Sequence, residues 1–393
     1  MQTWRIRLTG ILLLLALGPT VQAAQGEVVI GLLTPLTGTN AVQGTDIQRG
    51  VALAVERINA GYAVPLKGNL RLPFGPGVLG KPLRVLVEDT ESRPASAMDA
   101  VRKLVNVDKV PLVLGEYASG ISLPTGQFTN AQGVVQIAIA STSPALRDIG
   151  PFFFDVMGLD DVAGRALARF AVKDSGARRF TSIVPNNPFG VGIELHACKT
   201  LEEEFGGQCV AKVRYELEKP DYRAELQAAF QGNPEAGFYT AYGTEARLLF
   251  KQAYELGLKP PKGWYADYLT MWSNEVAQTP EIAEGVKGFE VGVSGDFYEA
   301  EYAQAYRAKY GEAPLTSFGA YAYDATWLAA LAIQLAGKPD PQAIRAALHV
   351  VDDAYLGVTG DKTFDADGMQ VTETYQWFIY TGGKLKPYPY PGE

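Results

Sequence analysis

The chain has 393 residues, of which 47% are hydrophobic, 20% are charged and 11% are aromatic, and its formal net charge is −8. This hydrophobic and aromatic content is typical of a folded chain and excludes an intrinsically disordered one. A net acidic chain without basic clusters is poorly suited to nucleic acid or to an anionic membrane surface, so neither partner is expected.

Residues 1–23 have the pattern of a cleavable export signal. Two arginines precede the apolar run 11–17, and Val21-Gln22-Ala23 provides small residues on both sides of the central position, as signal cleavage requires. The apolar run is too short for the ~20 residues of a membrane span, and no cysteine follows the cleavage point to carry a lipid anchor. A soluble periplasmic protein beginning at Ala24 is therefore expected, with a charge of −10 because the signal holds two arginines and no acid.

Apolar runs alternate with amphipathic segments through the first part of the mature chain. The predicted strands are 27–33, 83–88, 110–114 and 134–140, and the predicted helices are 48–59 and 95–108. The segment 61–77 is rich in Gly and Pro, which favours a surface excursion. Strand–helix alternation of this kind predicts an α/β fold with a parallel sheet and helices on both faces.

A second series of the same kind follows, with strands predicted at 179–184, 208–215, 237–241 and 263–266 and helices at 162–173, 222–230 and 244–257. The mature chain exceeds one ordinary core, so two doubly wound lobes are expected. The remaining tail mixes helices at 298–310, 321–335 and 341–349 with hairpin strands over 362–385 around Asp367-Gly368. Such a tail can complete both lobes by crossing between them.

The only two cysteines, Cys198 and Cys209, lie on a predicted helix and at the start of the strand that follows it. In an exported chain this arrangement favours a local disulfide, and two buried thiols are the alternative. A zinc site is not expected, because CxxC pairs are absent and the only histidines are His196 and His349.

Small polar residues follow the predicted strands 110–114 and 134–140, with Ser119 after the first and Ser141 and Thr142 after the second. In open parallel sheets, ligands bind just outside the carboxyl ends of the strands. Neither loop offers a metal ligand, a lysine or a general base, so the pattern favours holding a ligand over reacting it. The alternatives are that Ser119 caps the following helix and that Ser141 and Thr142 form a turn before a proline.

Six motifs in a fixed order resemble periplasmic solute-binding proteins of branched-chain amino acid ABC transporters, the leucine/isoleucine/valine-binding type. They are IGLLTPLTG with AVQG, LVLGEYASGISLP, IAIASTSPAL, IVPNNPFGVG, FYTAYGTEARLLFKQAYELG and WYADYL, and they extend over essentially the whole mature chain. The resemblance implies two Rossmann-like lobes joined by three crossover strands, which close on ligand like a hinged trap. We expect lobe 1 to hold 24–155 plus 291–357, and lobe 2 to hold 156–290 plus 358–393.

The resemblance also implies ligand contacts, first among them Ser119, which matches the family serine that binds the α-carboxylate. Ala140 and Thr142 match positions that supply backbone and hydroxyl contacts. Tyr242 matches a tyrosine that closes over the ligand, and Phe189 stands where a tyrosine is common. From the residues alone, Phe189 could be core and Tyr242 a surface tyrosine.

Asp267 is the best match to the acid that pairs with the ligand ammonium, with Tyr268 the competitor if the register differs by one residue. From the residues alone, Asp267 could also be a solvated loop acid or a helix cap. Gln43 stands where the branched-chain binder has an aromatic, and this polar amide puts leucine, isoleucine and valine in doubt as the only ligands. Phe318 is expected as an aromatic wall from the late part of lobe 1.

The function expected from these features is that of the extracytoplasmic solute-binding component of an ABC importer. It would capture an amino acid or related small carboxylate and deliver it to an inner-membrane permease. The resemblance implies a monomer, no enzymatic activity, no cofactor and no metal. A periplasmic sensor that passes the signal to a regulator is the alternative, since the fold supports both uses. A periplasmic enzyme on the same scaffold is a third hypothesis.

Overall fold

A computed structural model describes residues 26–271, 274–291 and 295–392. The expected export signal therefore lies outside the described residues. None of the described helices is both long enough and apolar enough to cross a membrane. The chain divides into two compact units: unit 1 comprises 1–158 and 293–372, and unit 2 comprises 159–292 and 373–393.

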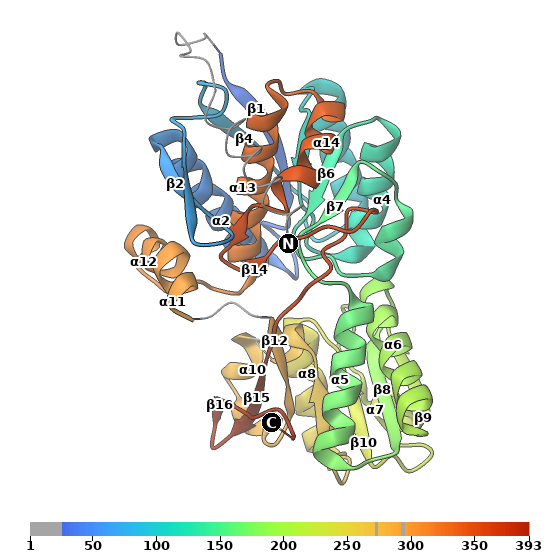
Figure 1. Ribbon diagram of the computed structural model, residues 1–393. Helices are drawn as coiled ribbons and strands as arrows, with labels where there is room; N and C mark the ends of the chain where they lie inside the picture. Colours follow the sequence, from blue (N-terminus) through green and yellow to red (C-terminus); the bar gives the residue numbers. More distant parts are fainter. Residues whose placement is uncertain (1–25, 272–273, 292–294, 393) are drawn as a thin grey trace. The chain divides into compact units, whose positions relative to one another are not determined.

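Unit 1 is built on a five-stranded sheet in the order β4-β1-β5-β6-β7, and every pairing in it is parallel. The strands are β1 (Val28–Thr34), β4 (Leu83–Asp89), β5 (Leu112–Leu114), β6 (Val135–Ala138) and β7 (Phe153–Asp155). The helices are α2 (Ala41–Ala60), α3 (Pro94–Arg102), α4 (Ser119–Ala131), α11 (Gly295–Tyr298), α12 (Gln304–Tyr310), α13 (Phe318–Ala336) and α14 (Pro341–Val351). Sixteen of the nineteen residues of α13 are buried, and this helix packs along α2, beside which it lies in Figure 1.

Short elements complete unit 1. They are the single helical turns η1 (Lys103–Val107), η2 (Pro144–Asp148) and η4 (Glu299–Ala303) and the two-residue strands β13 (Leu356–Gly357) and β14 (Gly360–Asp361). Residues 61–77, predicted as a surface excursion, contain the antiparallel hairpin β2 (Tyr62–Leu66) and β3 (Leu70–Phe74). The hairpin forms despite its Gly and Pro content because Val64, Leu72 and Phe74 are buried against unit 1.

Unit 2 is built on a seven-stranded sheet in the order β16-β15-β12-β11-β10-β8-β9. The parallel strands are β8 (Arg179–Pro185), β9 (Gln208–Tyr215), β10 (Ala236–Tyr239), β11 (Trp264–Ala266) and β12 (Lys287–Val291). The antiparallel hairpin β15 (Tyr375–Thr381) and β16 (Lys384–Pro387) extends this sheet beside β12. Helices α5 (Asp160–Ser175), α6 (Pro188–Phe205), α7 (Arg223–Ala229), α8 (Gly243–Glu255), α9 (Tyr268–Met271) and α10 (Asn274–Ala277) and the turn η3 (Pro280–Ala283) connect the strands.

The tail differs from its predicted layout. The sequence places one hairpin over 362–385 around Asp367-Gly368, whereas the hairpin of the structure turns at Gly382-Gly383, where both residues have positive φ. The predicted turn at Asp367-Gly368 is also present: Phe364 and Gln370 form an antiparallel bridge across it, and the Asp365 carboxylate accepts hydrogen bonds from the amides of Asp367 and Met369. Residues 358–372 accordingly cluster with unit 1, although the division by sequence assigned them to the second lobe.

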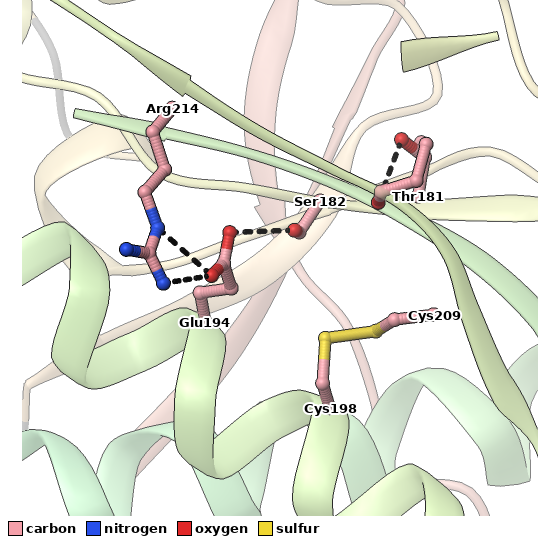
Figure 2. Close-up of a disulfide and its surroundings, with 7 residues drawn as sticks. Thr181, Ser182, Glu194, Cys198, Cys209 and Arg214 are labelled. Atoms are coloured by element: carbon pink, nitrogen blue, oxygen red, sulfur yellow. Dashed lines mark hydrogen bonds and ion pairs between the residues drawn. A yellow bond between two sulfur atoms is a disulfide. The ribbon is translucent and has the colours of Figure 1, made fainter. Parts of the chain in front are cut away.

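Cys198 on α6 and Cys209 on β9 are joined by a disulfide, with a Cα–Cα distance of 5.7 Å (Figure 2). Helix α6 begins at Pro188, and the side chain of the preceding residue, Asn187, caps it by accepting a hydrogen bond from the Gly190 amide. The helix ends before Gly206, which adopts the left-handed conformation. This stop turns the chain directly into β9 and brings the two cysteines together. Of the two arrangements that the sequence allowed, the structure has the disulfide.

Candidate ligand-binding site

Ser119 is the first residue of α4, the helix that follows β5 after a four-residue loop, and its hydroxyl reaches across to the loop after β6. The Oγ atom accepts hydrogen bonds from the backbone amides of Thr142 and Ser143, both at 3.1 Å. A hydroxyl has two acceptor positions and one proton. With both acceptor positions filled, the Ser119 hydroxyl can offer only its proton, which suits an anionic partner.

The N-terminus of α4 is not capped by a side chain. The N-cap residue is Ala118, and no side chain accepts a hydrogen bond there. Ser119 therefore does not cap its own helix, contrary to the alternative from sequence. The first amides of a helix have no intrahelical acceptor and bind anions readily. Ser119 and this helix end together form a donor-rich patch in unit 1.

The loop after β6 carries Ala140, Ser141 and Thr142, and all three are buried. The Ser141 hydroxyl lies 2.5 Å from that of Ser122 and also donates to the Glu116 carbonyl at 3.1 Å. These bonds use the Ser141 side chain inside unit 1, so we interpret Ser141 as a support for the loop. Thr142 is held by its amide to Ser119, which places it beside the donor-rich patch.

Two aromatic residues pack together near the same helix end. Phe318, at the start of α13, contacts Tyr117 edge to face with ring centroids 5.1 Å apart, and both side chains are buried. Tyr117 lies two residues before Ser119 in the chain, so this pair flanks the patch. Gln43 lies half-buried in the first turn of α2, the helix that follows the carboxyl end of β1.

A buried acid lies beneath the patch. Glu116 has no exposed surface, and it accepts hydrogen bonds from the Thr90 hydroxyl at 2.6 Å and from the Ala118 amide at 2.7 Å. Burial raises the pKa of Glu116 to about 7 against the lowering effect of these donors. The sequence had given no role to Glu116. Its flanking motif, GEYASG, offers no sign that the carboxylate turns inward.

In unit 2, the predicted aromatic residues form one cluster. Phe189, at the start of α6, packs against Tyr242 and Tyr268, with ring centroids 5.5 and 6.1 Å away. Tyr242 is 5% exposed, so it is not a surface tyrosine, and its hydroxyl accepts a hydrogen bond from the Asn187 amide group at 3.2 Å. Asn187 and Tyr268 were not assigned a role from the sequence. The first follows β8 in NNPFG, and the second was named only as the competitor for the register of Asp267.

Asp267 follows β11 directly and is fully buried. Its Oδ1 atom accepts the Thr270 hydroxyl at 2.8 Å and the Thr270 amide at 3.1 Å, which caps the short helix α9. Its Oδ2 atom is buried too, and no hydrogen-bond partner for it occurs among the residues that the structure describes. Burial raises the pKa of Asp267 to about 7, while its bonds with Thr270 act in the opposite direction.

Thr270 ties Asp267 to the aromatic cluster. Its hydroxyl accepts the Ala241 amide at 2.8 Å, and Ala241 immediately precedes Tyr242. The structure therefore brings Phe189, Tyr242 and Asp267 together at the carboxyl ends of neighbouring strands β8, β10 and β11. Asp267 is not a solvated loop acid. It does cap a helix, and the capping bonds are made through Oδ1 and not through Oδ2.

The chemistry of these residues suits binding rather than catalysis. Unit 1 offers hydroxyl and backbone donors for an anion, and unit 2 offers an acid and apolar ring surface. Across 26–271, 274–291 and 295–392, no group of three or more His, Cys, Asp or Glu side chains is arranged to hold a metal ion.

Comparison with known proteins identifies the family. The model of a periplasmic binding protein family matches residues 27–384. The chain belongs to this family. Its members are substrate-binding components of transport systems and are not enzymes, and the family name places them in the periplasm. The two-lobed α/β class predicted from sequence is thereby confirmed.

Individual relatives of this periplasmic binding protein support the branched-chain amino acid type. The Leu/Ile/Val-binding protein homolog 1 of Brucella abortus is 25% identical over 375 residues, which cover 94% of each chain. A leucine-, isoleucine-, valine-, threonine- and alanine-binding protein of Pseudomonas aeruginosa is 25% identical over 88% of this chain and 87% of its own. The crystal structure of LivJ from Streptococcus pneumoniae in complex with isoleucine matches with a TM-score of 0.76 and 26% identity, over 92% of this chain and 98% of that one.

Proposed function

We propose that this chain is the solute-binding component of an ABC importer in the Gram-negative periplasm, and that its ligand is an amino acid or a closely related small carboxylate. The observation that carries the proposal is the buried Asp267 carboxylate, whose Oδ2 atom has no hydrogen-bond partner among the described residues. A buried carboxylate oxygen without a partner costs several kcal/mol. A ligand ammonium would remove this cost and form a charge-assisted hydrogen bond.

The ligand carboxylate would be held in unit 1. Ser119 has only its hydroxyl proton left to donate, and the first amides of α4 lie beside it. These donors can satisfy a carboxylate without a formal positive charge, with the helix dipole adding to the attraction. Thr142 would add a contact from the neighbouring loop, and Ala140 would add a backbone contact.

The apolar part of the ligand would meet the aromatic residues. Phe189, Tyr242 and Phe318 offer rigid ring surfaces that exclude water at a small cost in conformational entropy. Gln43 adds a polar group where the related branched-chain binders have an aromatic. We therefore propose that the accepted side chains include polar ones as well as leucine, isoleucine and valine.

The proposed carboxylate contacts belong to unit 1 and the proposed ammonium contact belongs to unit 2. A ligand shifts a conformational equilibrium only through its differential affinity for the two states. In the proposed mechanism, ligand binding favours the state of the protein that the permease recognises.

A thermal-shift panel of amino acids, deaminated acids, aromatic acids and amides tests the proposal on the purified mature chain. A true ligand at 100 times its dissociation constant should add about 2.7 kcal/mol to the stability. Stabilisation by amino acids is the expected result. No response to any member of the panel would overturn the proposal, and recovery of a chemically altered ligand would favour an enzyme instead.

Export and transport need their own measurements. Sequencing the N-terminus of the protein from a periplasmic extract should show Ala24, as the proposed signal cleavage requires. Deleting the gene should abolish uptake of the radiolabelled ligand. If uptake is unchanged and the expression of a neighbouring operon is altered, the alternative function, a periplasmic sensor, is favoured.

A further inference from the structure

Strand β4 forms an open edge of the unit 1 sheet (Figure 1). Its even-numbered residues direct their backbone groups inward to β1, as the bond from the Val28 amide to the Pro82 carbonyl shows. The odd-numbered residues direct theirs outward. At Leu83 the outward amide and carbonyl are bonded to the side-chain amide of Asn59, at 2.8 and 2.9 Å.

The next two outward positions, Val85 and Val87, lack such a partner. Their backbone groups have no hydrogen-bond partner in the part of the chain that the structure describes. Proteins commonly protect an edge strand with a proline, a bulge or a covering loop, since free backbone groups pair with other chains. β4 contains no proline, and its seven residues pair with β1 in unbroken register, without a bulge.

Apolar surface lies beside this open edge. A groove of about 650 Å³ runs between α2, β4 and the end of α12, and its apolar lining includes Val51, Ala52, Val55, Val85 and Val87. Val87 is 36% exposed. The rim of the groove carries charges of both signs. Arg49 and Arg84 are positive, and Glu56 is negative. Free backbone groups and apolar surface therefore occur together at β4.

The sequence of β4, Leu-Arg-Val-Leu-Val-Glu-Asp, is complementary to itself when two copies run antiparallel about Leu86. Arg84 then faces Glu88 of the second copy, Val85 faces Val87, and Leu86 faces itself. We propose that two copies of this chain associate through antiparallel pairing of their β4 strands, with Leu86 at the twofold axis.

This register agrees with the direction of the backbone groups. Val85 and Val87 are both outward-facing, so each Val85–Val87 pair exchanges two hydrogen bonds, as antiparallel pairing requires. Arg84 and Glu88 then form the closer, non-hydrogen-bonded pairs, in which opposite charges stabilise the association. Pairing centred on Val85 or Val87 would place Arg84 or Glu88 opposite Leu86 instead.

The twofold symmetry also covers the groove. An axis perpendicular to the sheet keeps both α2 helices on the same face, so each copy covers the apolar lining of the other. Arg84 already contacts Glu27 within the chain, and both side chains of this ion pair are exposed, so the pair contributes little. Glu88 is half-buried and contacts the exposed Lys103, whose ammonium remains in water. The Arg84 and Glu88 side chains can therefore take a second partner across the interface.

Charge-reversal variants, studied alone and mixed, test the proposal. The oligomeric state of the mature chain is measured by sedimentation equilibrium over a series of protein concentrations. The wild type should dimerise in a concentration-dependent way. Arg84→Glu and Glu88→Arg should each weaken dimerisation by about tenfold or more, since each variant creates two like-charged cross-strand pairs. Mixing the two variants should restore association as a heterodimer, because every cross-strand pair is then of opposite charge.

Two further variants keep the test decisive. Val87→Pro removes an outward amide and leaves the hydrogen bonds to β1 intact, because an edge strand tolerates proline where the amide points away from the sheet. This variant should abolish association, and its melting temperature should remain close to that of the wild type. Lys199→Glu, at an exposed position in unit 2, should have no effect. A wild-type monomer at every concentration, as the family resemblance implies, would overturn the proposal. A dimer that resists both single reversals and Val87→Pro would also overturn it. The proposal is independent of which ligand the protein binds.

Discussion

Asp46 in unit 1 and Asp267 in unit 2 are both fully buried carboxylates, but their surroundings differ. Asp46 accepts five hydrogen bonds that connect α2 to α12 and to the start of α13. The donors are the hydroxyls of Tyr306 and Thr316 and the amides of Leu315, Thr316 and Gly319. The two hydrogen bonds that Asp267 accepts from Thr270 go to one and the same oxygen, Oδ1.

The difference separates a carboxylate whose two oxygens are both bonded within the fold from the one that we propose binds the ligand ammonium. Burial raises the pKa of both side chains, so burial alone does not distinguish them. Both oxygens of Asp46 are occupied by donors from its own unit, which fixes the N-terminus of α13. One oxygen of Asp267 is left without a partner among the described residues, at the carboxyl end of a parallel strand.

The largest expected effect is on binding. Asp267→Ala should weaken binding of an amino acid by about 3 kcal/mol or more, because the ligand ammonium would then be buried without its counter-charge. Titration calorimetry against the amino acid and its deaminated analogue measures the contrast, and the analogue should lose far less. Ser119→Ala is the matched control, since it should weaken both ligands alike. Equal losses of both ligands in Asp267→Ala would show that Asp267 is not the ammonium partner.

The second effect is on folding. Asp46→Ala leaves the donors from Leu315, Thr316 and Tyr306 unsatisfied, so it should lower the free energy of unfolding by about 3 kcal/mol. Urea unfolding of the ligand-free protein provides the measurement. The affinity of the fraction that remains folded should be unchanged. A stable Asp46→Ala protein that no longer binds the ligand would contradict the division between the two carboxylates.

The third effect depends on pH. With a pKa of about 7, the Asp267 carboxyl is protonated in the free protein at lower pH and must lose this proton to pair with an ammonium. The affinity for an amino acid should therefore fall by about tenfold for each pH unit below about 7. Glu116 also has a pKa raised to about 7, so its ionisation affects any carboxylate ligand. The ratio of affinities for the amino acid and its deaminated analogue isolates the contribution of Asp267, and a constant ratio would contradict it.

The smallest effect is a gain in stability. A carboxyl whose pKa is raised by folding stabilises the protein at low pH, and this contribution is lost as the pH rises through about 7. Asp267→Asn removes the buried charge, so at about pH 8 it should stabilise the ligand-free protein by about 1 kcal/mol. The gain should disappear at about pH 4. Asp46→Asn should instead lower the free energy of unfolding, because the N–H groups of the new side-chain amide would face hydrogen-bond donors. Unfolding curves at both pH values test this.

Most of the architecture could be predicted because it depends on local patterns. Short apolar runs alternating with amphipathic helices predict the parallel sheets. Strands β5 and β6 both lie within the predicted apolar runs. Elements whose stability depends on distant residues were missed or displaced. The β2–β3 hairpin forms because its apolar side chains are buried, and the tail makes a second hairpin turn, at Gly382-Gly383, beyond the predicted one at Asp367-Gly368.

The candidate site was predictable as a set of positions, and its residues remain predictions as ligand contacts. Family motifs and strand ends singled out Ser119, Tyr242 and Asp267. The direction of each side chain was beyond the sequence. Ser141 follows the same strand as Thr142, yet its hydroxyl turns inward to Ser122 and to the Glu116 carbonyl.

The sequence by itself determined the fold class and the family, because hydrophobic periodicity and ordered motifs are properties of the linear chain. Only the tertiary structure decided which buried carboxylate is fully bonded and which is not. It also decided that the backbone groups of Val85 and Val87 lie at an open edge. Both facts depend on donors and strands brought together from distant parts of the chain, and no local pattern records which of them meet.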